Sequence, residues 1–188
     1  MRVITGSAKG HKLKAPKGMG TRPMLDRVKE ALFSVLEGYN AIHGRVLDLY
    51  AGTGSLGIEC LSRGAEWTDF VERSSQVCRI IQDNLQHTRL QDRAQVVQLS
   101  VERFLATVQP DQKYAIITMD PPYADPAIHD TIRKVAELGL LDHEGILIVG
   151  HSPRVDLEDT YGQLKRIKYR RLGDSCFSIY EPETIPKT

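Results

Sequence analysis

The chain has 188 residues, of which 41% are hydrophobic and 26% charged, with a net charge of +1. This length and composition are typical of one globular domain with a full core, or of one domain with a small appendage. No apolar run approaches the ~18 residues that a membrane helix requires, and the start MRVITGSAKG has no apolar signal segment. We therefore expect a cytoplasmic protein without a membrane partner.

The charge is unevenly distributed along the chain. Residues 1–30 hold eight basic and two acidic side chains, so the remainder is mildly acidic. A basic segment on an acidic body favours a polyanionic partner approached from one side, although a solvated surface hairpin has the same composition. The candidate RNA-binding residues of this segment are Lys9, Lys12, Lys14, Lys17, Arg22 and Arg27.

The three cysteines are odd in number and far apart in the sequence. Two of them, Cys60 and Cys78, lie in helix-like segments, and Cys176 lies near the C-terminus. Buried thiols are therefore expected rather than disulfides or a metal site.

The N-terminal segment is expected to form a β-hairpin. RVITGSAKGHKLKAP has the pattern of two short strands joined around Gly6 and Gly10, followed by a loop rich in proline and glycine. We predict a basic hairpin arm over residues 1–22 and a main domain over residues 23–188. The main domain opens with a helix from Met24, which we expect to end at Gly38.

Strand and helix patterns alternate after this helix. Strands are expected at 46–50, 68–72, 94–100, 114–120 and 145–151, and helices at 56–64, 75–87, 101–108 and 126–138. Such alternation with nearly continuous apolar strands predicts an α/β fold, a mostly parallel sheet covered by helices on both faces. The tail predicts two antiparallel strands around 173–174, which complete a seven-stranded sheet of Rossmann-like type.

A glycine loop follows the first strand of the main domain. Gly52, Gly54 and Gly57 fit the G-x-G-x-x-G pattern between a strand and a helix, and Glu72 ends the next strand. Such a loop binds a nucleoside-containing cofactor, and the acid accepts hydrogen bonds from a ribose. Asp48 inside the apolar strand must face a polar ligand or loop. It would repel a pyrophosphate but suit a sulfonium and an ammonium, which favours S-adenosylmethionine.

The strand 114–120 ends in the sequence Asp120-Pro121-Pro122-Tyr123. By the handedness of crossovers this strand should lie beside strand 46–50, so its end faces the cofactor. The prolines stiffen the loop and offer no N–H, so the polar groups are the Asp120 carboxylate and the Pro121 carbonyl. Two acceptors beside an aromatic ring suit the exocyclic amine of a nucleobase stacked on Tyr123.

These motifs carry a resemblance to a known family. DLYAGTGSLGIECLSRGA, FVE, MDPPY and TRPMLDRVKEALFSVL resemble the bacterial methyltransferases that modify N2 of a guanine in 16S ribosomal RNA, over nearly the whole chain. The resemblance implies a class I S-adenosylmethionine-dependent methyltransferase domain with an N-terminal hairpin. It implies no metal, a site on 16S rRNA of the small subunit or its assembly intermediate, and a monomer.

The resemblance also implies residue roles. Asp120, Pro121, Pro122 and Tyr123 would hold the guanine. The residues assigned to the cofactor are Asp48, Tyr50, Ala51, Gly52, Thr53, Gly54, Glu72, Arg73, Ser100, Val101 and Arg22. Relatives usually have an acid at the position of Ser100, whose hydroxyl can still bond the adenine. Gly150 stands where an acidic residue is common and receives no role.

Three alternatives remain open from the sequence. A nicotinamide-dependent oxidoreductase fits the glycine loop and Glu72, but leaves the Asp-Pro-Pro-Tyr sequence unexplained. A non-catalytic RNA-binding protein is hard to reconcile with that intact sequence. An adenine-N6 DNA methyltransferase would use the same four residues. A second basic run, Lys165 to Arg171, is expected either to contact RNA or to form a solvated sheet edge.

Overall fold

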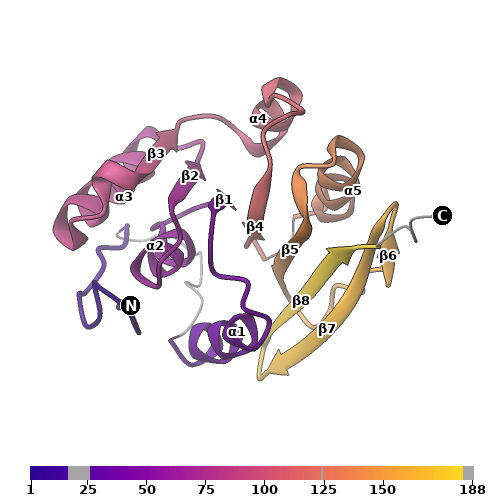
Figure 1. Cartoon of the computed structure of the whole chain (residues 1–188), viewed down its shortest axis with the longest axis horizontal. Helices are drawn as coiled ribbons and strands as arrows, with labels where there is room; N and C mark the ends of the chain where they lie inside the picture. The colour runs from indigo at the N-terminus through magenta and orange to yellow at the C-terminus, as the bar shows by residue number, and fades with distance from the viewer. Residues whose placement is uncertain (17–25, 124, 184–188) are drawn as a thin grey trace.

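One sheet organises the chain, with strand order β3-β2-β1-β4-β5-β8-β7-β6 (Figure 1). The computed structural model describes residues 1–16, 26–123 and 125–183. The strands are β1 (Arg45–Leu49), β2 (Trp67–Val71), β3 (Ala94–Val97), β4 (Tyr114–Met119), β5 (Leu141–His151), β6 (Thr160–Tyr161), β7 (Leu164–Leu172) and β8 (Ser175–Pro182). Strands β3 to β5 of this order pair in parallel, and β8, β7 and β6 continue antiparallel.

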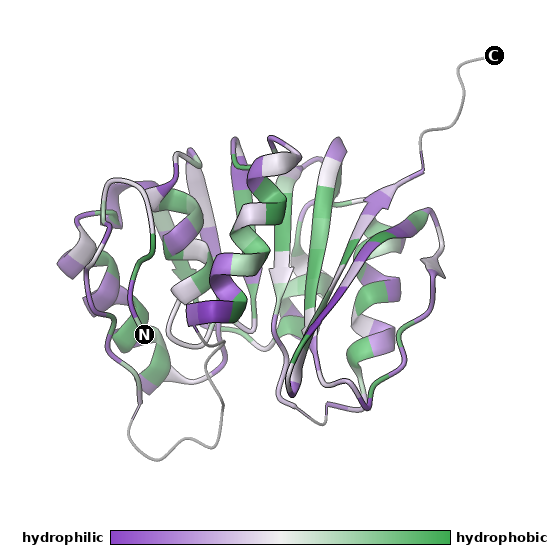
Figure 2. Cartoon of the chain, turned by 90° about the horizontal axis from the view of Figure 1, so that it is seen from below, coloured by the Kyte–Doolittle hydropathy of each residue, from purple (hydrophilic) through white to green (hydrophobic). Residues whose placement is uncertain are grey.

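Helices cover both faces of the sheet. They are α1 (Asp26–Gly38), α2 (Ser55–Ser62), α3 (Ser75–Thr88), α4 (Val101–Thr107) and α5 (Ile128–Leu138), with a 3₁₀ turn at Gln91–Arg93. One face packs on α1, α2 and α3, and the other on α4 and α5. Hydrophobic residues run along the central strands, as Figure 2 shows. All six residues of β4 are buried, as expected for a strand covered on both faces.

Local sequence signals set several helix ends. The Ser74 hydroxyl accepts a hydrogen bond from the N–H of Val77 and so caps the start of α3. Helix α5 ends at Gly139, whose φ of 57° is a left-handed conformation that glycine adopts without strain. The predicted order of strands and helices from α1 to β5 is therefore confirmed, with ends that differ by a few residues.

Two sheet predictions are corrected. The sheet has eight strands rather than seven, because Thr160–Tyr161 forms the short strand β6 on the edge of β7. A strand of two residues shows no alternation that a sequence pattern could reveal. Strand β3 ends at Val97 rather than at residue 100, because Ser100 instead caps the start of α4 by accepting the N–H of Arg103.

The expected N-terminal pair of strands is also wrong for residues 1–16. A single antiparallel bridge joins Arg2 to Lys12, with no strand on either side of it in this described segment. Backbone hydrogen bonds do join residues 1–3 to residues 10–13, but the pairing stops there because the next N–H groups bond to α2. Ile4 and Thr5 donate their N–H groups to Glu59, and Ser7 donates to the Ser62 carbonyl. The boundary drawn between residues 22 and 23 lies outside the described residues.

A buried ion pair fastens this N-terminal segment to the domain. Lys29 Nζ lies 3.0 Å from Glu59 Oε2, and both side chains are fully buried. Lys29 also donates to the Arg2 carbonyl at 2.6 Å and to the Ser55 hydroxyl at 3.1 Å, while Glu59 accepts from Arg63 Nε. Every donor and acceptor of the pair thus has a partner, which a buried charge requires.

In the described part of the chain, no helix is long and apolar enough to cross a membrane. The three cysteines are buried, as predicted. Among the same residues, no cluster of three or more His, Cys, Asp or Glu side chains is arranged to hold a metal ion.

Removing the buried lysine charge should destabilise the fold. Lys29→Met leaves Glu59 buried without its main counter-charge, and we expect a loss of about 3 kcal/mol in the free energy of unfolding, measured with urea. Lys134→Met is the matched control, because the pair of Lys134 with Glu137 is exposed, and it should cost less than about 0.5 kcal/mol. Equal losses in the two variants would show that the buried pair does not hold the segment.

Candidate active site

The loop between β1 and α2 contains the first two glycines of the motif. Gly52 and Gly54 have φ angles of 56° and 78°, which side-chain-bearing residues rarely adopt. The Gly52 N–H donates to Glu72 Oε2 at 3.2 Å, and Glu72 Oε1 accepts the N–H of Ser74 at 2.9 Å. Glu72 therefore ties the glycine loop to the end of β2.

The third glycine of the loop has a packing role. A Cβ on Gly57 would lie 2.3 Å from the Phe70 ring, so only glycine lets α2 approach β2 this closely. The Gly57 N–H donates to Asp48 Oδ2 at 3.0 Å. The start of α2 is thus fixed both by contact with β2 and by a hydrogen bond from β1.

Asp48 lies beneath the loop, with 2% of its surface exposed. Its second oxygen accepts the Thr118 hydroxyl at 2.8 Å, so the carboxylate joins β1, α2 and β4. Burial raises the pKa of Asp48 from 3.8 to about 7. The sequence required Asp48 to face a polar ligand or loop, and in the structure its partners are Gly57 at the start of α2 and Thr118 on β4.

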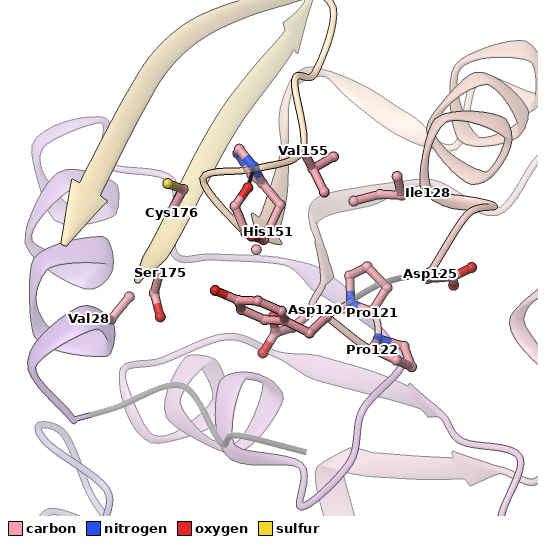
Figure 3. Close-up of a pocket in the computed structure, with 13 residues that line it drawn as sticks. Val28, Asp120, Pro121, Pro122, Asp125, Ile128, His151, Val155, Ser175 and Cys176 are labelled. Atoms are coloured by element: carbon pink, nitrogen blue, oxygen red, sulfur yellow. Dashed lines mark hydrogen bonds between the residues drawn. The ribbon is translucent and has the colours of Figure 1, made fainter. Parts of the chain in front are cut away.

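The end of β4, the strand next to β1, lines a pocket. Asp120, Pro121, Pro122 and Tyr123 line a pocket together with residues of α1, α5, β5 and β8 (Figure 3). The added lining residues are Val28, Asp125, Ile128, Gly150, His151, Ser152, Val155, Ser175 and Cys176. Burial raises the pKa of Asp120 from 3.8 to about 6. The Tyr123 ring is 52% exposed, and its hydroxyl donates to the Asp174 carbonyl at 2.7 Å.

Gly150 is a site residue that sequence reasoning left without a role. A Cβ at this position would lie 2.4 Å from Asp120 Oδ1, so the space that the carboxylate occupies exists because β5 has no side chain there. A glycine inside a buried strand is the sequence signal for such a close approach.

The other residues assigned to the cofactor differ in their contacts and in their exposure. The Ala51 N–H donates to the Val71 carbonyl, and Thr53 Oγ1 lies 3.4 Å from Met1 Sδ. The Tyr50 hydroxyl bonds to Thr131 on α5. Arg73, which follows Glu72, is exposed, and Ser100 caps the start of α4. The Val101 side chain is buried in the core, so only its backbone could contact a cofactor.

The candidate RNA-binding residues are only partly described. Lys9, Lys12 and Arg27 are exposed, whereas Lys14 pairs with Asp83 at 3.1 Å. Lys17 and Arg22 lie outside the described residues. The exposed cations on the described part of the N-terminal segment remain available to a polyanion.

The family described as conserved hypothetical protein 95 matches residues 1–181. The chain belongs to this family.

Several relatives match nearly the whole length of the chain. It is 37% identical to "Putative rRNA methyltransferase YlbH" of Bacillus subtilis, over 96% of this chain and 98% of that protein. It is 30% identical to "Ribosomal RNA small subunit methyltransferase D" of Escherichia coli, over 97% and 90%. The solved structure "Putative methyltransferase yhhF from Escherichia coli" superposes with a TM-score of 0.85 at 30% identity, over 98% of this chain and 99% of that one. The Rossmann-like methyltransferase fold is thereby confirmed.

The raised pKa of Asp48 predicts a pH-dependent stability difference. An acid with a raised folded-state pKa stabilises the fold below its unfolded pKa of about 4, and this contribution is lost as the pH rises toward about 7. Asp48→Asn removes this titrating group. As the pH rises across this range, the free energy of unfolding of wild type should therefore fall relative to that of the variant by up to about 1.4 kcal/mol per pH unit. Urea unfolding at several pH values measures the difference. Asp111→Asn, an exposed control, should follow wild type, and an Asp48→Asn curve parallel to wild type would contradict the assignment.

Proposed function

We propose that the protein transfers a methyl group from S-adenosylmethionine to N2 of a guanine in 16S rRNA of the small ribosomal subunit. The observation that carries the proposal is the position of the Asp120–Tyr123 segment beside the glycine loop, at the same edge of the sheet. Parallel pairing of β1 with β4, with Leu49 opposite Met119, brings the two together. Ligands of doubly wound folds bind at such a switch point.

The residues present fit the cofactor. The positive φ angles at Gly52 and Gly54 favour glycine, so the loop has no side chain at these two positions, and Glu72 lies directly beside it. A carboxylate has acceptor sites for about four hydrogen bonds, so Glu72 can accept ribose hydroxyls as well as its two backbone N–H groups. We assign Ser100 and the Val101 backbone to the adenine. We assign Asp48 to positioning the start of α2, since it is buried beneath Gly57 and Thr118, whereas Glu72 is partly exposed.

The end of β4 would hold the acceptor. S-adenosylmethionine, when bound, supplies an electrophilic methyl group on a sulfonium. The Asp120 carboxylate and the Pro121 carbonyl accept the two hydrogens of the guanine amine, which orients its nitrogen and stabilises the positive charge that develops there. With a pKa of about 6, Asp120 is largely ionised at neutral pH and can take the proton released from nitrogen. Tyr123 stacks on the base.

The relatives support an rRNA substrate. One relative is named as an rRNA methyltransferase and another as a small-subunit rRNA methyltransferase, each matching along nearly the whole chain. Exposed Lys9 and Lys12 fit phosphate contacts. We also propose that the protein acts in the cytoplasm. Because its substrate would be as large as a ribosomal particle, we expect it to act as a monomer. The family match favours this interpretation over a nicotinamide-dependent enzyme, while adenine N6 in DNA is the rival that the four Asp120–Tyr123 residues would also serve.

The reaction can be tested with tritiated S-adenosylmethionine and small ribosomal subunits from a strain that lacks the enzyme. Digestion of the RNA should yield labelled N2-methylguanosine. Asp120→Asn removes the charge and one acceptor, so we expect a loss of about 100-fold or more in kcat. The cofactor affinity, measured by calorimetry, should stay close to wild type.

Asp111→Asn, which changes an exposed aspartate between α4 and β4, is the matched control and should retain full activity. Label in DNA or in another nucleoside would overturn the substrate assignment and leave the methyltransferase assignment in place. An active Asp120→Asn variant would refute the role of the carboxylate.

A further inference from the structure

An exposed tyrosine lies on β7 next to the pocket. Tyr169 pairs with Ser178 across the strands, and its hydroxyl lies 3.2 Å from Cys176 Sγ. Its ring centroid is 6.0 Å from that of His151, at an angle of 38°. Cys176 and His151 both line the pocket that contains Asp120 (Figure 3). Tyr169 therefore lies beside the pocket, on the β7–β8 hairpin, in contact with two of the lining residues.

The support beneath this ring is rigid. His151 is buried, with Nδ1 bonded to the Ser152 carbonyl and Nε2 to the Ser178 hydroxyl, each at 3.0 Å. Tyr169 itself is 48% exposed. Arg166 Cζ lies 5.9 Å from the ring centroid, so the guanidinium covers part of the ring. The part of the ring that stays exposed is suited to stacking on another ring.

A cation accompanies the tyrosine on the same face. Arg171 pairs with Cys176 in the register, and paired residues of antiparallel strands share a face, so Arg171 lies two residues from Tyr169 on the pocket side. Its side chain is exposed, and its Nε donates to the Gly173 carbonyl. Within the described residues, Arg171 forms no ion pair with a carboxylate, so its charge is available to an anion.

Protection of a sheet edge explains the charge but not the tyrosine. Strand β6 pairs only with Leu164 and Lys165, so the rest of β7 is an edge where basic residues discourage aggregation. An exposed aromatic ring would not serve that purpose. A ring and a cation side by side at the rim of a base pocket match the pattern by which proteins hold unpaired nucleotides.

We propose that Tyr169 and Arg171 form a second nucleotide subsite, which holds the neighbour of the target guanine. Tyr169 stacks on the neighbouring base, and Arg171 contacts a phosphate. The subsite rests on the proposed function, because it takes its ligand from the same RNA strand. It requires the RNA to be locally single-stranded at the target, since a base paired in a helix cannot stack on a protein ring.

The test is steady-state methylation of small ribosomal subunits from a strain that lacks the enzyme. Tyr169→Ala should raise KM for the subunits roughly tenfold, the effect of losing one stacked base, while kcat and cofactor affinity stay within about twofold. Tyr169→Phe keeps the ring and should behave as wild type. Tyr39→Ala removes another exposed tyrosine, at the end of α1, and should change nothing.

Arg171→Ala is an independent variant on an exposed side chain. It should raise KM and lower the slope of log KM against log salt concentration by about one phosphate contact. Wild-type KM values in both Tyr169→Ala and Arg171→Ala, with methylation intact, would overturn the subsite and leave the proposed function standing. A wild-type protein that methylates no rRNA guanine would overturn the proposed function and the subsite with it.

Discussion

The parallel pairing of β4 with β1 is the constraint on which the site depends. The two strands are separated in sequence by β2, β3 and three helices, yet they lie side by side with Asp48 opposite Thr118. The hydrogen bond between these two side chains links the strands near the ends at which both strands leave the sheet. The glycine loop and the Asp120–Tyr123 segment must therefore emerge at the same edge, whatever the surrounding loops do.

The two buried carboxylates at this edge of the sheet have different surroundings and therefore different roles. Asp48 is enclosed by donors from α2 and β4, so it shapes the loop that would hold the cofactor. Asp120 follows β4 and faces a pocket, in a space that exists because Gly150 has no side chain. The same physical effect, desolvation, raises both pKa values, but only Asp120 lines the pocket that would receive a substrate.

The sequence predicted those parts of the fold that repeat a pattern. Alternating apolar strands and amphipathic helices were enough for β1 to β5 and for the position of Asp120 beside the loop. The two-residue strand β6 and the N-terminal contacts were not predictable, because they depend on partners distant in sequence. Ile4 and Thr5 continue the predicted first strand, but Glu59 on α2 accepts their N–H groups. The role of Gly150 was likewise not predictable, because it depends on the contact of β5 with Asp120.

A crystal structure with bound S-adenosylhomocysteine tests the central claim most directly. We expect its ribose hydroxyls to lie within hydrogen-bond distance of Glu72 and its sulfur to face the pocket of Asp120 and Tyr123. A ligand bound away from the glycine loop, or one whose sulfur points away from Asp120, would contradict the account. In either case β1 and β4 would not bring donor and acceptor together.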